Sequence, residues 1–321
     1  MCKVTVQDAA AMLKDADRIL ILIHQYPDGD TIGSGFALCH ALQRLGKQAR
    51  VLCHDIIPEK YAYMTSEVPQ MEFEPAFICS VDVADQKLLG ESLQEYVEHV
   101  ELSIDHHGSH RQFGKHLLLD ASCGANAMIV LQVIEQLGVE IDALTADCLY
   151  TGITTDTGCF KYSNTTPLTH RMAAQLMEAG AKAETINREM FDIKSRARVK
   201  LEQMAMQSMT FYDDGRCAFM SITEEMIAQS GAAENDMEGL SPLTRQIEGV
   251  WVGVTMREKE DGCFKISVRT GTHADASAIC VLLGGGGHNR AAGCTIDGTL
   301  AEAKAAVLAA AEKAIPRLIT G

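Results

Sequence analysis

Apolar and polar positions alternate in a regular rhythm along the first half of the chain. Short apolar runs of strand length lie at residues 18–24, 48–54, 76–82, 100–107 and 115–120. The segment 31–46 spaces its apolar residues as a helix does, with Thr31 as the expected N-terminal cap and Gly46 at the end. This order of strands and helices predicts an α/β fold, in which a mostly parallel sheet carries helices on both faces.

The pattern becomes helical after Gly124. Helices are expected at 125–138, 142–158 and 167–180, followed by a long polar helix at about 184–209. Strands are then expected at 216–223, 249–258 and 263–270, the last two joined by a turn at 259–262. A helix at 273–283 is expected to end in the glycine run, and the stretch 291–298 and a final alanine-rich helix follow. We therefore predict a first domain at 1–185, a linker helix at 186–210 and a smaller α+β domain at 211–321.

Composition and charge narrow the class of protein. The 321 residues carry a formal net charge of −15 and contain no run of lysine and arginine, so a long polynucleotide is not the expected partner. The 11 cysteines are scattered without a CxxC pair, which favours free thiols in a reducing compartment. Neither a signal peptide nor an apolar stretch of membrane-spanning length is visible. We expect a cytoplasmic protein with no membrane partner.

Acidic and imidazole side chains gather where the predicted strands end. His24, Asp28 and Asp30 follow the first strand, Asp82 the third, Asp105, His106 and His107 the fourth, and Asp156 lies at the end of a predicted helix. In open parallel sheets, ligands bind in the crevice beyond these carboxyl ends. So many negative charges in one place would repel one another, and divalent cations are the natural compensation. Two ions about 3.5–4 Å apart form the clamp used for in-line displacement at phosphorus.

Each piece of this pattern also has a structural interpretation. The sequence DGD at 28–30 is typical of a solvated turn, and DHH at 105–107 could be a hydrogen-bonded core cluster. Asp82 could cap the helix that follows it. These interpretations are independent, and all of them would have to hold while four element ends converge. The combined pattern therefore favours a metal site.

The motifs resemble those of a known family. The stretches HQYPDGDTIGSG (24–35), VD (81–82), IDHH (104–107) and TGITTDTGCFKYSNTTP (151–167) are similar, in order and spacing, to the four motifs of the DHH phosphoesterase superfamily. The stretch GGGGHNRAAG (284–293) resembles the glycine-rich signature of the DHH-associated C-terminal domain. Together with DMEGLSPLTRQIEGV (236–250), these motifs resemble the branch of nanoRNases and pAp phosphatases.

The resemblance implies a role for each clustered residue. His24, Asp28 and Asp82 would hold a first cation, and Asp30, Asp82, His106 and Asp156 a second, so that Asp82 bridges the two. His107 would contact the scissile phosphate, and Asp105 would orient the histidines. The expected cations are manganese, with cobalt, iron, magnesium or zinc as alternatives.

The second domain offers a candidate site for the substrate. Four consecutive glycines precede His288 and could present backbone N–H groups to an anion, although a flexible helix end is the alternative. We predict substrate binding by Arg269, Gly286, Gly287, His288 and Arg290. The sequence has neither a P-loop lysine motif nor a GxGxxG after a strand, which disfavours those nucleotide-binding folds.

The resemblance further implies a two-metal phosphoesterase. Its expected substrates are short oligoribonucleotides, cleaved to mononucleotides, and 3′-phosphoadenosine 5′-phosphate (pAp), which would lose its 3′-phosphate to give AMP. A phosphodiesterase for linear dinucleotides such as pApA and a metal-dependent nucleotide sensor without turnover are the alternatives. The sequence leaves open the native metal, the cleavage polarity, the preferred substrate length and whether the chain forms a homodimer. It departs from the family at Met128, near an often acidic position, and at His110, where asparagine is common.

Overall fold

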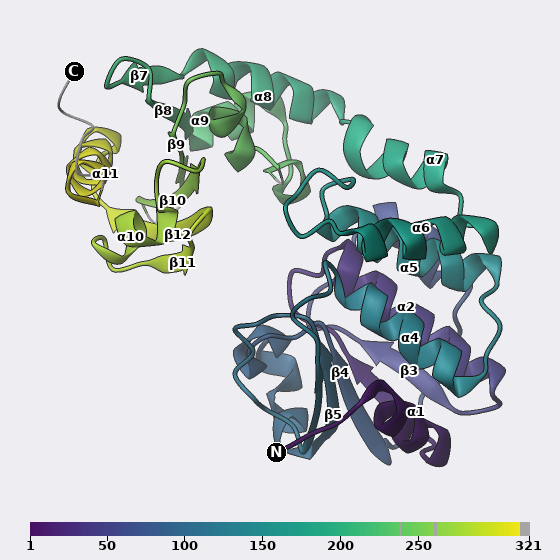
Figure 1. Cartoon of the computed structure of the whole chain (residues 1–321). Helices are drawn as coiled ribbons and strands as arrows, with labels where there is room; N and C mark the ends of the chain where they lie inside the picture. The colour runs from purple at the N-terminus through teal and green to yellow at the C-terminus, as the bar shows by residue number, and fades with distance from the viewer. Residues whose placement is uncertain (238, 260–261, 315–321) are drawn as a thin grey trace. The chain divides into compact units, whose positions relative to one another are not determined.

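The chain consists of two compact units, Met1–Ile193 and Lys194–Gly321 (Figure 1). The computed structural model describes residues 1–237, 239–259 and 262–314. Among these residues, none of the helices combines the length and apolar character needed to span a bilayer. The expected turn at 259–262 lies partly outside the described residues.

The first unit is built around a six-stranded parallel sheet. Its strands are β1 (Cys2–Lys3), β2 (Ile19–Leu22), β3 (Ala49–Leu52), β4 (Phe77–Val81), β5 (Val100–Asp105) and β6 (His116–Leu119), in the order β1-β6-β5-β4-β2-β3. Every strand pair is parallel. The five apolar runs of the sequence form β2 to β6, whereas the short β1 was not expected. All carboxyl ends of these strands therefore lie at one edge of the sheet.

The first unit contains helices of three kinds. The α-helices are α1 (Val6–Asp15), α2 (Gly29–Arg44), α3 (Ala62–Thr65), α4 (Asn126–Leu137), α5 (Ala143–Asp156), α6 (Pro167–Glu178) and α7 (Ala183–Asn187). The 3₁₀ helices are η1 (Glu59–Tyr61), η2 (Gln86–Leu89) and η3 (Glu91–His99), and η4 (Arg188–Asp192) is a π-helical turn. The mixed α/β architecture confirms the predicted fold class.

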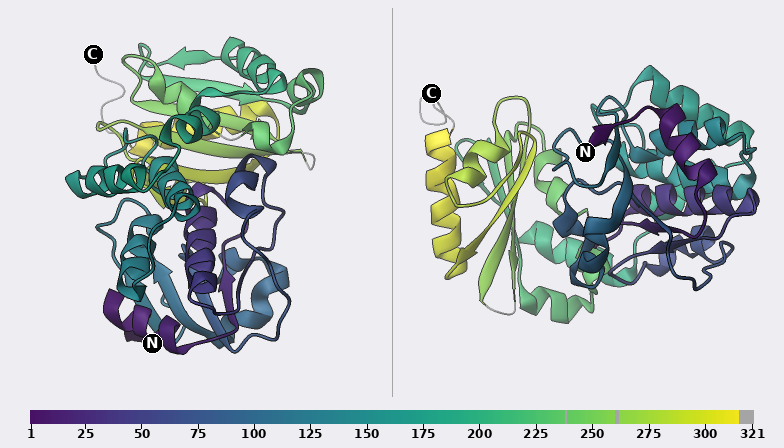
Figure 2. Two further views of the ribbon diagram at one scale, coloured as in Figure 1. Left: turned by 90° about the vertical axis from the view of Figure 1, so that its right-hand side faces the viewer. Right: turned by 90° about the horizontal axis from the view of Figure 1, so that it is seen from below.

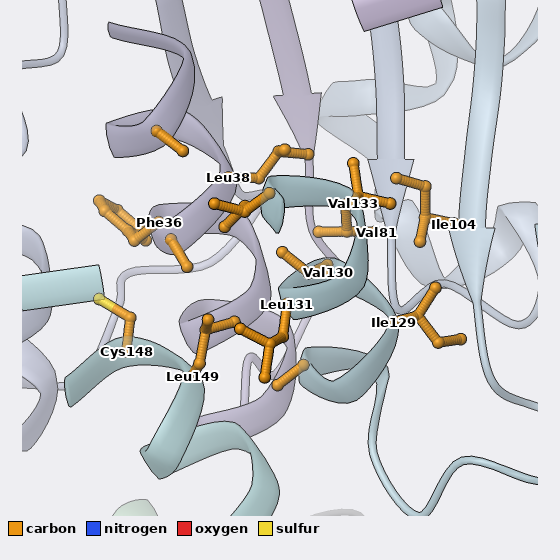
Figure 3. Packing of buried hydrophobic residues seen from close by; sticks show 14 of the residues in the cluster. Phe36, Leu38, Val81, Ile104, Ile129, Val130, Leu131, Val133, Cys148 and Leu149 are labelled. Carbon is orange, nitrogen blue, oxygen red and sulfur yellow. The ribbon is translucent and has the colours of Figure 1, made fainter. Parts of the chain in front are cut away.

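The sheet is buried on both faces, because successive side chains of a strand point to opposite sides. Ile19 and Ile21 of β2 belong to the cluster formed with α2, α4 and α5, whereas Leu20 and Leu22 pack with η2 and η3. Figure 3 shows the first cluster, in which Leu38, Val130 and Leu149 come from these three helices. The continuous apolar run RILILI is thus explained by burial on both faces.

Helix α2 begins earlier than the sequence predicts. Its N-cap is Asp28, whose carboxylate accepts hydrogen bonds from the backbone N–H groups of Asp30 and Thr31. The expected cap at Thr31 is therefore wrong, because an aspartate three residues earlier already satisfies the free N–H groups of the first turn. Gly46 follows the helix with φ +80°, the left-handed conformation common at helix ends.

The second unit contains a mixed six-stranded sheet. Its strands are β7 (Thr210–Tyr212), β8 (Cys217–Ile222), β9 (Val252–Glu258), β10 (Cys263–Thr270), β11 (Gly286–His288) and β12 (Ala291–Asp297), in the order β11-β12-β10-β9-β8-β7. Only β8 and β9 pair in parallel among these described strands. The helices are α8 (Arg196–Gln207), α9 (Glu224–Ser230), α10 (Ala276–Val281), α11 (Leu300–Ala314) and the 3₁₀ helices η5 (Glu234–Met237) and η6 (Ser241–Gln246).

This second sheet also has two apolar faces. Helices α10 and α11 pack on one face through residues such as Ile279 and Val307, and Figure 2 shows both helices beside the same sheet. On the other face, Leu201 and Ala205 of α8 pack against Met220 of β8. The second unit is therefore α+β, as the sequence predicts.

The segment between the units differs from the predicted linker helix at 186–210. Helix α7 ends at Asn187, a π-helical turn follows, and α8 begins only at Arg196. Ser195 starts the new helix by accepting a hydrogen bond from the backbone N–H of Arg198. The prediction of one continuous helix is wrong, because this serine cap restarts the helix after the π turn.

Candidate active site at the carboxyl edge of the parallel sheet

The strand order places β2 and β4 at a switch point of the first sheet. The chain leaves β2 through α2 toward β3 on one side, whereas β4 lies on the other side and leads toward β5. Connections that diverge in this way leave a crevice beyond the carboxyl ends of the strands, where open α/β sheets bind ligands. The loops after β2, β4 and β5 all reach this crevice.

His24, Asp28 and Asp82 form a first group of ligand-type atoms within 4.8 Å of one another. The Nε2 atom of His24 lies 3.7 Å from Asp28 Oδ1 and 3.7 Å from Asp82 Oδ2. The other ring nitrogen, Nδ1, lies 2.7 Å from the carbonyl oxygen of Gln25 and donates to it, which leaves Nε2 as the ligand atom. Burial disfavours the imidazolium, but the hydrogen bond and charge of Asp28 outweigh burial and raise the pKa of His24.

Asp30, His106 and Asp156 form a second group. His106 Nε2 lies 3.9 Å from Asp30 Oδ2, 3.6 Å from Asp156 Oδ2 and 3.5 Å from Asp82 Oδ1. Its Nδ1 atom lies 3.2 Å from the carbonyl oxygen of Cys123, so the ring again turns Nε2 toward the carboxylates. Asp82, a member of the first group, thus also lies next to the second.

Asp82 has the energetically least favourable environment of the cluster residues. Its side chain is 3% exposed, and among the described residues its Oδ1 atom has no hydrogen-bond partner. Its φ of +58° lies in the left-handed region, which costs a non-glycine residue about 1 kcal/mol or more. Burial, followed by the charges of Asp30 and Asp28, raises the pKa of Asp82 well above its usual range. A buried carboxylate without a hydrogen-bond partner, carried by a strained backbone, is typical of a residue that binds a metal ion.

Helix α4 supports Asp30 through contacts that were not predicted from the sequence. The backbone N–H groups of Asn126 and Ala127 donate to the Asp30 carboxylate at 2.6 and 2.9 Å, and Ser34 Oγ donates at 3.3 Å. These N–H groups are free because they belong to the first turn of α4. Burial nevertheless raises the pKa of Asp30. The sequence indicated only a helix start near residue 125, and this does not tell which residue the N–H groups of its first turn point toward.

Glycines bring Asp156 close to Asp30. A Cβ at Gly33 of α2 would lie 2.2 Å from the carbonyl oxygen of Cys148 in α5, and a Cβ at Gly152 would lie 2.7 Å from Asp30 Oδ1. The two helices therefore approach more closely than larger residues allow. Burial and the neighbouring carboxylates, Asp30 first, raise the pKa of Asp156 to about 8.

Asn164 ties the end of α5 to the start of α4. Its side-chain Nδ2 donates to the carbonyl oxygens of Asp156 at 3.1 Å and Gly124 at 2.9 Å. This contact was not predicted, although Asn164 lies inside the TGITTDTGCFKYSNTTP motif. It fixes the backbone that carries the Asp156 carboxylate.

His107 and Asp105 form a hydrogen-bonded pair beside the cluster. His107 Nδ1 lies 2.8 Å from Asp105 Oδ1 and 3.6 Å from Asp82 Oδ1. Burial lowers the pKa of His107, but the hydrogen bond and charge of Asp105 outweigh it, and the net change is upward. Asp105 itself is fully buried and also receives the backbone N–H of His106 at 2.8 Å.

The two departures from the family have structural roles here. His110 is 7% exposed, accepts the backbone N–H of Gln112 at Nδ1 and lies 3.2 Å from Ser103 Oγ through Nε2. Nε2 is also 3.9 Å from Asp105 Oδ2, so His110 packs behind the His107–Asp105 pair. Met128 is fully buried, with its sulfur 3.8 Å from Thr169 Oγ1.

The predicted substrate residues lie in the second unit. Arg269, Gly286 and Gly287 line a groove of about 1270 Å³ together with Arg257 and Lys265. The stretch Gly286–His288 is a strand paired with β12, whereas Gly284, the first of the four glycines, has φ +76° and follows α10 as a helix end does. Arg290 donates to the carbonyl oxygens of Gly271 and Ala274 and so braces a neighbouring loop. Substrate binding by Arg269, Gly286, Gly287, His288 and Arg290 stays a prediction.

The donor set of the first unit suits divalent cations. Imidazole nitrogens and carboxylate oxygens together match manganese, iron, cobalt and zinc better than calcium. The buried and unpartnered Oδ1 of Asp82 supports the same conclusion, because a buried carboxylate oxygen without a partner costs about 1–3 kcal/mol. Acidic and histidine groups are thus positioned for metal binding at this edge.

Known proteins share both parts of this chain. The DHH family, N-terminal domain, matches residues 18–153, and the DHHA1 domain matches residues 218–316. The bifunctional oligoribonuclease and PAP phosphatase NrnA of Thermus thermophilus is 35% identical over 288 residues, which are 87% of this chain and 84% of that protein. The protein of the same name from Bacillus subtilis is 25% identical over 87% of this chain and 90% of its own length.

Solved structures share the fold of this chain. An exopolyphosphatase-related protein from Bacteroides fragilis has a TM-score of 0.89 and 26% identity over 98% of both chains. RecJ from Thermus thermophilus, in complex with Mn²⁺, shares the fold with a TM-score of 0.56 and 18% identity over 96% of this chain and 55% of RecJ. From its sequence matches and its structure, the chain belongs to the DHH family and carries a DHHA1 domain.

Proposed function

We propose that this chain is a metal-dependent phosphoesterase that hydrolyses short oligoribonucleotides to mononucleotides and converts pAp to AMP. The observation that carries the proposal is the meeting of two groups of ligand-type side chains around the buried Asp82. The relatives from Thermus thermophilus and Bacillus subtilis, whose names give both activities, match most of the chain. The net charge of −15 agrees with short substrates, since long nucleic acids require a basic surface.

We assign the cation ligands by the two groups. His24, Asp28 and Asp82 would hold one ion, and Asp30, Asp82, His106 and Asp156 the other. Manganese is the ion we propose, and cobalt, iron, zinc or magnesium would fit the same donor types. When bound, two such ions neutralise the carboxylates and lower the pKa of a water molecule enough for in-line attack on phosphorus.

His107 is the proposed contact to the scissile phosphate. Asp105 accepts the Nδ1 proton of His107, which fixes the ring and leaves Nε2 for the substrate. The side chain is 37% exposed, so a phosphate oxygen can reach it. The raised pKa favours the protonated ring, which donates a hydrogen bond to negative charge developing on the phosphoryl group.

The second unit is the proposed substrate-binding domain. Arg269, Gly286 and Gly287 line the polar groove of that unit, and His288 and Arg290 belong to the same hairpin. Basic side chains and glycine N–H groups are suited to phosphate and sugar oxygens. We accordingly propose residues 1–185 as the catalytic domain and 211–321 as the substrate-binding domain.

A turnover assay tests this function. The purified chain with Mn²⁺ is given oligoribonucleotides of two to about ten residues, pApA and pAp, and the products are separated by chromatography. We expect mononucleotides from the short oligomers, falling rates with increasing length, and AMP from pAp. The Asp82→Ala variant, measured in parallel, should lose the activity because it lacks the carboxylate shared by both groups.

Three results would contradict the proposal. Absence of mononucleotide, AMP and phosphate with every divalent ion tried would exclude a phosphoesterase and favour a sensor. Turnover of pApA without turnover of trimers or pAp would restrict the chain to linear dinucleotides. Near-normal turnover by Asp82→Ala would show that the site lies elsewhere.

A further inference from the structure

Tyr26 is an exposed aromatic residue inside the proposed active-site loop. It lies two residues after His24 and two before Asp28, both members of the first ligand group. Its side chain is 80% exposed, although aromatic rings usually bury most of their surface. The ring is therefore accessible to a ligand, and its backbone lies in the loop that carries two members of the cluster.

The protein holds Tyr26 in this place at a cost. Its φ of +54° is in the left-handed region, which is unfavourable for a bulky residue. The backbone N–H of Tyr26 donates to Asp55 Oδ2 at 2.7 Å, and the N–H of Gln25 donates to the carbonyl oxygen of Leu88 at 2.6 Å. The loops after β3 and β4 thus fix a conformation that the residue would not adopt by itself. Strain of this kind accumulates where a side chain has to be presented for function.

The neighbouring loops add apolar surface. Ile56, next to Asp55, is 94% exposed, and Leu88 is 39% exposed. Exposed apolar side chains and the polar cluster thus occur on one set of loops that backbone N–H groups connect. A nucleotide has this dual character, because its phosphate is charged and its base has a flat π-face.

We propose that Tyr26 is the stacking platform for the nucleobase of the nucleotide whose phosphate lies at the ligand cluster. The inference rests on the proposed function and adds the residue that recognises the base. Stacking on an aromatic ring tolerates every base, because all bases have a π-face, so Tyr26 would support affinity without sequence preference. Asp55 acts as a positioning residue that holds the Tyr26 backbone.

The test separates the contribution of the base to substrate binding from that of the phosphate groups. Kinetic constants are measured for Tyr26→Ala, Tyr26→Phe and Tyr26→Gly on pAp and on ribose 3,5-bisphosphate, which lacks the base. Loss of one stacked base is worth about 1–3 kcal/mol, so Tyr26→Ala should raise KM for pAp at least about tenfold and leave kcat within a factor of about two. KM for the base-free substrate should not change, and Tyr26→Phe should keep the wild-type KM.

Three variants test a structural explanation. Tyr26→Gly should raise the melting temperature, since glycine removes the backbone strain. It should raise KM for pAp as much as Tyr26→Ala does. Phe211→Ala removes a ring that is 50% exposed on the edge strand β7 of the second unit, and it should leave KM unchanged. Asp55→Ala should reproduce part of the rise in KM.

AMP binding distinguishes this inference from the proposed function. Calorimetric titration with AMP and Mn²⁺ measures stacking without turnover, and Tyr26→Ala should weaken the binding about tenfold or more. If wild type and Tyr26→Ala have equal AMP affinity and equal KM, the stacking role is refuted. Turnover by the wild type would still support the phosphoesterase activity. Tyr26-dependent AMP binding without any turnover would support stacking and refute the phosphoesterase. Equal rises in KM for both substrates would also refute stacking, since the base would not matter.

Discussion

At the scale of single residues, Asp82 concentrates the costs that the site imposes on the fold. It combines a buried carboxylate, an Oδ1 atom with no hydrogen-bond partner among the described residues, and a left-handed backbone. Four neighbouring carboxylates raise its pKa further in addition to burial. None of these features stabilises the protein, so we interpret Asp82 as retained for what it binds.

Replacement of Asp82 by asparagine separates the effect of this residue on stability from its effect on activity. Asparagine tolerates φ of +58° and removes the buried negative charge, so the metal-free Asp82→Asn protein should melt several degrees higher than the wild type. Turnover should fall by at least about a thousandfold, because an amide is a far weaker cation ligand than a bridging carboxylate. Thermal melting in EDTA and a pAp assay with Mn²⁺ measure the two effects.

Asp213 offers a matched control for this substitution. It is also an aspartate in the left-handed region, with φ of +54°, but its Oδ1 atom is 2.7 Å from Arg216 Nη2. Asp213→Asn should not raise the melting temperature, since it loses an ion pair, and it should retain full turnover. A lower melting temperature for metal-free Asp82→Asn, or turnover above a tenth of wild type, would contradict the role assigned to Asp82.

At the scale of helices and strands, the contact between α2 and α5 sets the geometry of the second ligand group. Gly29 and Gly33 of α2 face Thr155 and Cys148 of α5 at distances that leave no room for a Cβ. Asp30 lies on the same turn of α2, and Asp156 ends α5. The helices are therefore close because the residues between them are small.

Gly33→Ala should widen this contact. The new Cβ would lie 2.2 Å from the carbonyl oxygen of Cys148, a backbone atom that cannot move alone. We expect a loss of about 1–3 kcal/mol in the free energy of unfolding, partly offset by the better helix propensity of alanine. Denaturant unfolding measures this loss, and calorimetric titration with Mn²⁺ should show at least tenfold weaker binding.

Gly35→Ala is the comparison for this change. It lies in the same helix and gains the same propensity, but its Cβ would meet side-chain atoms, with the nearest at 2.8 Å on Ile23. We expect a smaller loss of stability and no change in cation affinity. Unchanged Mn²⁺ affinity in Gly33→Ala would show that the α2–α5 contact does not position Asp30 and Asp156.

The strands and the clustered side chains could be predicted because their signals are local. A buried strand such as β2 needs a continuous apolar run, and parallel strands bring their carboxyl ends to one edge. The structure brings His24, Asp28, Asp30, Asp82, His106 and Asp156 together as that logic requires. Their binding of cations stays a prediction.

The missed features depend on contacts between distant segments. Nothing local in the sequence aims the N–H groups of Asn126 and Ala127 at Asp30, which lies 96 residues earlier than Asn126. The same holds for Asn164, which links two helix ends. The break after Asn187 was missed because Ser195 is an N-cap only if the chain has already left the preceding helix.

At the scale of the whole molecule, the acidic cluster makes stability depend on pH and on cations. Burial and mutual repulsion raise the pKa of Asp82 and Asp30, and that of Asp156 to about 8 from an ordinary value of 3.8. A group whose pKa is higher in the folded state stabilises the fold below its unfolded pKa and loses this contribution as pH rises through its folded pKa. Asp28, whose pKa is lowered from 3.8, acts in the opposite direction, but only below that pH.

The metal-free protein should therefore lose stability between about pH 4 and pH 8, the window given by Asp156. Melting temperatures in EDTA should fall steadily from pH 5 to pH 8. Added Mn²⁺ should raise them more at pH 8 than at pH 5, because cations bind the deprotonated ligands and replace the lost protons. Asp156→Asn removes one titrating group and should flatten the metal-free profile. A melting temperature in EDTA that stays constant or rises over this range would contradict the pKa shifts, and an equal Mn²⁺ effect at both pH values would contradict carboxylate ligation.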